Sequence, residues 1–116
     1  MLKIRGSGTT DAVKTHKSSA HSNYFQMRWI IVDVSNPNAP VQVDRSTLTG
    51  SPTLDIERQF VPGSNDYWEP FDVNPIDLKQ AKGVANTYIE GGVFRYTVKN
   101  LDNKYEVWLN PMHISL

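Results

Sequence analysis

The chain has 116 residues, of which 39% are hydrophobic and 21% are charged, and its formal net charge is zero. This length favours one domain with a core of its own, and the lack of cysteine excludes a disulfide framework, a thiolate metal site and a cysteine nucleophile. The longest apolar run, 29–32, is too short to cross a bilayer. We expect no signal peptide, no contact with a membrane, and a cytoplasmic location or incorporation into a virion.

Charge is unevenly distributed along the chain. Residues 1–23 carry four basic side chains and one acidic one, a net charge of +3, whereas residues 24–116 carry eight basic and eleven acidic ones, a net charge of −3. Leu2 and Ile4 could form a short edge strand, but the segment after them has too few apolar residues to offset the entropy lost on ordering. We predict a polar basic N-terminal arm over 1–23 and a single β-rich domain over 24–116.

Residues 24–34 form the first strongly predicted strand. Met27, Trp29 and Ile31 would share one face, and Ile30 and Val32 the other, so apolar residues on both faces favour a central strand. Shorter strands are predicted at 41–44 and 54–60. A long loop with proline and glycine, 61–73, follows them and contains Tyr67 and Trp68.

A helix is predicted from Pro75 to Ile89. Asn74 is a favoured N-cap and Pro75 suits the first helical position. An apolar stripe recurs at helical spacing; it consists of Leu78, Ala81, Ala85 and Tyr88. Gly83 disfavours a helix by about 1 kcal/mol relative to alanine, and could mark a close approach to a strand.

The clearest pattern is a β-hairpin from Val93 to Leu109. Two strands of period two flank the sequence 100–103, where Asn and Asp tolerate left-handed backbone conformations. The predicted buried face consists of Phe94, Tyr96, Val98, Tyr105, Val107 and Leu109, and the outer face of Arg95, Lys99, Glu106 and Trp108. We expect Asn110 and Pro111 to end the second strand.

These elements predict an α+β fold. A mostly antiparallel sheet of about five or six strands would carry the helix on one face, with the buried face of the hairpin beneath it. A small β-barrel or sandwich capped by the helix is the alternative.

The sequence contains no pattern typical of a catalytic, metal or cofactor site. His16 and His21 are five residues apart, without the spacing that places two ligands on one helical face. Asp33 follows an apolar strand, where an aspartate commonly caps a turn. We expect no enzymatic activity, no cofactor and no bound metal.

Protein–protein contact is the function that the composition favours. We expect a structural or adaptor subunit of a larger assembly, for instance a small phage or viral particle protein, bound to protein partners that could include its own copies. The alternatives are a small inhibitor or immunity-type protein and a single-stranded nucleic-acid-binding module, although the acidic charge of 24–116 opposes the latter. The predicted partner-binding residues are basic side chains and exposed aromatics: Lys3, Arg5, Lys14, Lys17, Tyr67, Trp68, Arg95 and Trp108.

Overall fold

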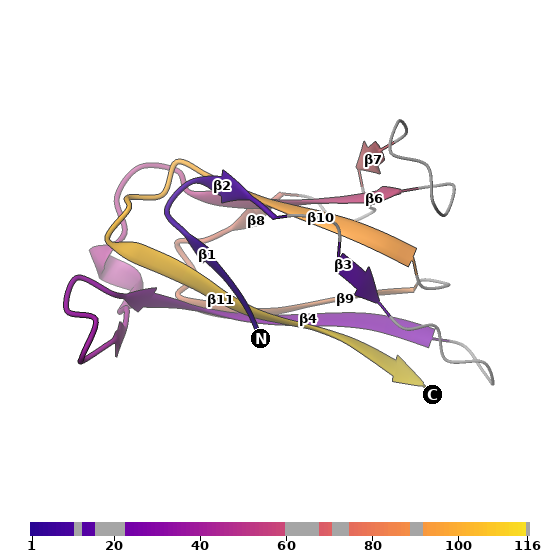
Figure 1. Cartoon of the computed structure of the whole chain (residues 1–116), viewed down its shortest axis with the longest axis horizontal. Coiled ribbons are helices and arrows are strands. Elements are labelled where there is room, and N and C mark those ends of the chain that lie inside the picture. Colours follow the sequence, from indigo (N-terminus) through magenta and orange to yellow (C-terminus); the bar gives the residue numbers. More distant parts are fainter. Residues whose placement is uncertain (11–12, 16–22, 60–67, 71–74, 89–91, 116) are drawn as a thin grey trace.

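Two antiparallel β-sheets pack face to face in the computed structural model, which describes residues 1–10, 13–15, 23–59, 68–70, 75–88 and 92–115 (Figure 1). Sheet A contains β1 Leu2–Arg5, β11 Tyr105–Ser115, β4 Asn23–Asp33, β5 Val41–Gln42 and β9 Lys82–Tyr88. Sheet B contains β2 Gly8–Thr9, β3 Val13–Thr15, β10 Gly92–Lys99, β6 Thr53–Gln59, β7 Trp68–Pro70 and β8 Ile76–Asp77.

The order of the strands places β11 and β4 at the centre of sheet A. Their antiparallel pairing extends from Tyr105 opposite Asp33 to Ser115 opposite Asn23. On the outer edge of β11 lies β1, and β4 pairs on its other edge with β9 and β5. In sheet B, β10 and β6 are the central pair. The predicted central strand at 24–34 therefore has neighbours on both edges.

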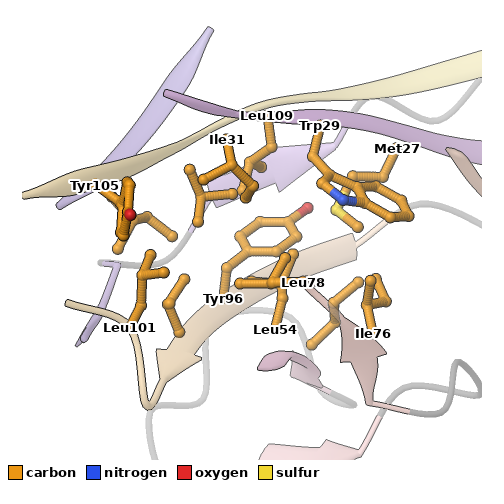
Figure 2. Packing of buried hydrophobic residues seen from close by; sticks show 14 of the residues in the cluster. Met27, Trp29, Ile31, Leu54, Ile76, Leu78, Tyr96, Leu101, Tyr105 and Leu109 are labelled. Carbon is orange, nitrogen blue, oxygen red and sulfur yellow. The ribbon is translucent and has the colours of Figure 1, made fainter. Parts of the chain in front are cut away.

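The core fills the space between the two sheets. Sheet A contributes Met27, Trp29 and Ile31, and sheet B contributes Phe94 and Tyr96, all of which are buried. Figure 2 shows the ring of Tyr96 rising from β10 towards Ile31 on the opposite sheet. Aromatic and β-branched residues at alternate positions favour these strands because each such side chain packs on a half-buried pleated surface.

The predicted hairpin is wrong in its pairing, although both of its strands form. Its buried face is buried as predicted, yet β10 lies in sheet B and β11 in sheet A. The connection between them crosses from one sheet to the other, with Asn100 in the left-handed region at φ 59°. Alternation of apolar and polar residues identifies the side chains that face the core. It does not show whether two successive strands pair in one sheet or face each other across the core, because the alternation is the same in both cases.

The predicted helix over 75–89, and with it the α+β class, is also wrong; Ile89 itself lies outside the described residues. Asp77 ends β8, and its carboxylate accepts a hydrogen bond from the backbone N–H of Lys79 at 2.8 Å, which favours a turn over a helix. The chain then enters β9 and pairs with β4 from Lys82 to Tyr88. Within the described ranges, the one helical segment is a 3₁₀ turn, Arg45–Thr47. No helix in these ranges is long and apolar enough to span a membrane. Long-range strand pairing has overridden a weak local propensity.

Gly83 explains part of this outcome. It lies opposite Trp29 in the β9–β4 pair, and a Cβ atom at this position would be 2.0 Å from Cζ2 of the Trp29 ring. The indole thus lies directly on the backbone of β9, a packing that glycine alone permits. The expected close approach to a strand is present, but it joins two strands and involves no helix.

The predicted break at Asn110 and Pro111 is wrong as well, because β11 continues to Ser115. The carbonyl of Tyr105 accepts a hydrogen bond from the backbone N–H of Gly6, on the β1 side of β11. Along a strand, the backbone groups of every second residue point to the same side, so those of Pro111, like those of Tyr105, point away from β4. The pairs with β1 end at Leu2 opposite Leu109. Proline at 111 therefore removes no hydrogen bond from the β11–β4 ladder.

Candidate interaction surface

The outer face of sheet A carries a group of side chains from four strands. Residues opposite one another in register point to the same side of a sheet, and those alternating with the buried residues point outward. The register aligns Lys3 with Trp108, Trp108 with Ile30, and Ile30 with Lys82 in a single row across the sheet. We call this surface the basic face; it consists of Lys3, Arg5, Arg28, Ile30, Lys82, Val84, Glu106 and Trp108.

The basic face contains four cations and one acidic side chain. None of the four cations forms an ion pair with another residue in the described part of the chain. Arg5 donates a hydrogen bond from Nε to the carbonyl of Asn103 at 2.9 Å, and Glu106 accepts one from Nε1 of Trp108 at 2.9 Å. The four cations of the basic face are therefore not neutralised by ion pairs with other described residues.

Trp108 lies on β11, between Lys3 of β1 and Ile30 of β4, and is half-buried. The Nζ atom of Lys3 is 4.3 Å from the centroid of its ring, a favourable cation–π distance. A hollow of about 160 Å³ adjoins the indole and is lined by Met1, Arg28, Trp29, Ile30, Trp108, Leu109 and Asn110. This volume is below the roughly 300 Å³ at which small-molecule sites begin, so the hollow is suited to one side chain.

The outer face of sheet B has a different arrangement of charge. Arg95 lies opposite Glu57 and contacts its carboxylate at 2.5 Å, and Lys99 contacts Asp55 at 2.9 Å. The Asp55 carboxylate, which accepts a hydrogen bond from Lys99, raises the pKa of that lysine. We call this surface the ion-pair face; it consists of Asp55, Glu57, Trp68, Arg95, Thr97 and Lys99.

Trp68 covers part of the ion-pair face. It belongs to β7, opposite Gln59, and the guanidinium carbon of Arg95 is 4.4 Å from the centroid of its ring. The tryptophan is half-buried and Gln59 beneath it is 6% exposed. Trp68 therefore packs back onto its own sheet.

The structure divides the predicted partner-binding residues between these two faces. Lys3, Arg5 and Trp108 are brought together on the basic face, and Trp68 and Arg95 on the ion-pair face. For Lys14 the backbone is described, opposite Val93 in the β3–β10 pair. Lys17 and Tyr67 lie outside the described residues.

The predicted outer face of the hairpin does not exist as one surface. Arg95 and Lys99 point outward from sheet B, whereas Glu106 and Trp108 point outward from sheet A, on the opposite side of the molecule. The reason is the crossing of the chain between sheets after Asn100.

Four residues of the basic face were missed by the sequence analysis: Arg28, Ile30, Lys82 and Val84. The first two alternate with Met27, Trp29 and Ile31, so strand parity alone could have placed them on an outer face. The other two lie in β9, where a helix was predicted, and no local pattern could have placed them beside β4.

A second concave region lies where β4 and β5 join. This groove of about 630 Å³ includes Asp33, Val41, Asp44, Lys104 and Tyr105 in its lining. Two of its charged groups are engaged locally: Asp33 accepts hydrogen bonds from the Ser35 hydroxyl at 2.6 Å and the Ser35 N–H at 2.9 Å, and Lys104 lies 5.0 Å from the centroid of Tyr105. These bonds from Ser35 lower the pKa of Asp33 and identify it as a turn cap, as its position in the sequence suggested.

The described residues contain no group of three or more histidine, aspartate or glutamate side chains that could hold a metal ion. His16 and His21 lie outside these ranges, and the side chain of His113 is not described. Comparisons of the chain with models of protein families, with curated proteins and with solved structures found no match. Chemically, the basic face combines cations for carboxylates or phosphates with apolar groups that exclude water.

Proposed function

We propose that the chain is a binding subunit of a larger protein assembly and that its basic face contacts an acidic surface of a neighbouring protein. The observation that supports this proposal is the set of four cations, without ion pairs within the described structure, beside the half-buried Ile30 and Trp108 and the exposed Val84. Val84 among them is 52% exposed. A neighbour with carboxylates would neutralise these cations, and its apolar groups would cover the side chains between them.

A protein partner fits this face better than a nucleic acid. Binding to phosphates needs basic side chains, and stacking of bases needs an open aromatic ring. Here Lys3 already lies over the ring of Trp108, and Ile30 and Val84 offer apolar surface that phosphates cannot use. Tryptophan and arginine surrounded by apolar residues are, in contrast, typical of protein interfaces.

Site-specific photo-crosslinking in the cells that produce the chain tests this proposal. A benzoylphenylalanine replaces Val84 on the basic face, and in a second protein it replaces Thr97 on the ion-pair face as a matched control. We expect one discrete covalent adduct with a protein from position 84, identified by mass spectrometry, and no such adduct from position 97. The adduct should be lost when Arg28→Glu and Lys82→Glu are added.

Three results would contradict the proposal. The same adducts could form from both positions, the adduct could survive charge reversal, or the material crosslinked at position 84 could be digested by nuclease. The last result would favour the single-stranded nucleic-acid-binding alternative. Circular dichroism of the charge-reversed protein shows whether the fold is retained, so that a loss of crosslinking reports on the surface.

A further inference from the structure

We infer that the segment bound by the basic face is acidic and extended, and that it places one apolar side chain in the hollow beside Trp108. This inference rests on the proposed function and specifies the chemistry of the partner. Its basis is the volume and lining of the hollow and the register positions of Lys3 and Lys82 on the strands to either side.

The hollow is built to receive an apolar group. Trp108 and Ile30, opposite each other in the β11–β4 pair, supply apolar walls, and Arg28 and Asn110, the next outward pair along the same strands, supply a polar side. Hot spots of protein interfaces are commonly single side chains seated in such pockets, surrounded by groups that exclude water. The volume of about 160 Å³ accommodates one such side chain and little more.

The backbone positions of Lys3 and Lys82 are spaced for an extended chain. Lys3 and Lys82 stand at the two ends of the row whose middle members are Trp108 and Ile30. Neighbouring strands are about 4.8 Å apart, so the backbones of the two lysines are separated by about 14 Å, and the middle of the row is about 7 Å from each. Two residues of extended chain span about 6.6 Å, and residues two apart point to the same side.

These distances predict the pattern of the bound segment. An apolar residue at the middle of the row would have acidic residues two positions before and two positions after it, each directed at one lysine. The segment would then cross the strands of sheet A instead of running along them. Arg28 lies beside the hollow and provides a further cation for the same segment.

The probe for this inference is a synthetic seven-residue peptide with a central leucine, aspartate two positions to each side, and serine elsewhere. One control peptide has serine in place of leucine, and a second keeps leucine but moves both aspartates next to it. Titration calorimetry on the full chain measures affinity, and amide shifts of the ¹⁵N-labelled chain locate the site. Because burial of one leucine side chain contributes to binding, we expect about ten-fold weaker binding of the serine peptide.

Charge-reversed proteins give the matched comparison. Lys82→Glu on the basic face should weaken the leucine peptide about ten-fold, whereas Lys99→Glu on the ion-pair face should leave its affinity unchanged. Amide shifts should concentrate in β1, β11, β4 and β9. Arg28→Glu provides a second basic-face variant that should weaken binding in the same direction.

The outcomes separate this inference from the proposed function. If the leucine and serine peptides bind equally and Lys82→Glu still weakens both, the apolar side chain in the hollow is overturned, whereas the acidic partner of the proposed function is retained. Equal binding of the two leucine peptides overturns the predicted spacing. No binding of any peptide at millimolar concentration overturns the acidic segment altogether. Tighter binding of a deoxythymidine oligomer of equal charge would contradict both the inference and the proposed function.

Discussion

The two outer faces of the molecule carry similar charged side chains but arrange them differently. On the ion-pair face, Arg95 lies opposite Glu57 and Lys99 reaches Asp55, so the charges neutralise one another within the sheet. On the basic face, the residue opposite Lys82 is Ile30. For Arg95 and Lys82, the residue opposite in register decides whether the cation is paired within its sheet or remains accessible to another molecule. Arg5 lies opposite Glu106 but donates its hydrogen bond to the carbonyl of Asn103.

This difference has an energetic consequence. A cross-strand ion pair at half-exposed positions, such as Arg95 with Glu57, contributes about 0.2 to 1 kcal/mol to the free energy of unfolding. The cations of the basic face have no such pairs among the described residues, so replacing Arg28 or Lys82 should change stability little. The ion-pair face should thus respond to mutation in stability, and the basic face in binding.

The largest expected effect comes from breaking sheet A beneath the basic face. Gly83→Ala places a Cβ atom 2.0 Å from the ring of Trp29, which is 5% exposed and packed in the core. Such overpacking should lower the free energy of unfolding by about 3 kcal/mol, measured by urea denaturation. Gly8→Ala is the control, because its nearest contact would be an ordinary 3.9 Å and we expect a change below about 0.5 kcal/mol. Equal effects of the two substitutions would contradict the packing of Trp29 on β9.

A smaller effect distinguishes the two faces directly. Arg95→Ala removes both the ion pair with Glu57 and the stacking on Trp68, and should lower the free energy of unfolding by about 1 kcal/mol. Lys82→Ala, on the basic face, should change it by less than about 0.5 kcal/mol. Urea denaturation of both variants at low salt is the measurement. If Lys82→Ala were the more destabilising of the two, the contrast between the faces would be wrong.

The smallest expected effect is the pH dependence of the Lys99–Asp55 pair. Asp55 raises the pKa of Lys99, so the stability gained from this lysine is complete below its unfolded pKa of about 10.4 and is lost as pH rises through the higher folded value. The free energies of unfolding of the wild type and Lys99→Met should differ at pH 8 and converge above this range. A difference that persists or grows at high pH would show that the pair does not act as described.

Much of the core could be predicted from the sequence. The alternation in 24–34 and 93–109 identified Met27, Trp29, Phe94, Tyr96 and Leu109 as inward-facing residues, and all of them are buried. The turn role of Asp33 was also predictable, because an aspartate followed by serine at a strand end bonds locally. The partition of the chain into an arm over 1–23 and a body stays a prediction, although β1, β2 and β3 contribute strands to both sheets.

The candidate surface could be predicted only in part. Lys3, Arg5 and Trp108 were identified from charge and residue type, but nothing local placed them beside Lys82, about eighty residues along the chain from Lys3. The strand order β1–β11–β4 with β9 on the far edge does so. The same order places Arg95, once grouped with Trp108, on the opposite face of the molecule.

What the sequence determined by itself is the side to which each strand residue points, because alternation follows from the geometry of a single extended backbone. What only the tertiary structure decided is which strands pair. The connection 100–104 could have joined neighbouring strands in one sheet, and 78–88 could have formed a helix. Instead, β9 pairs along the edge of β4, and the ring of Trp29 packs on the backbone of Gly83. Pairing depends on contacts between distant segments, and those contacts gathered the basic face from four strands.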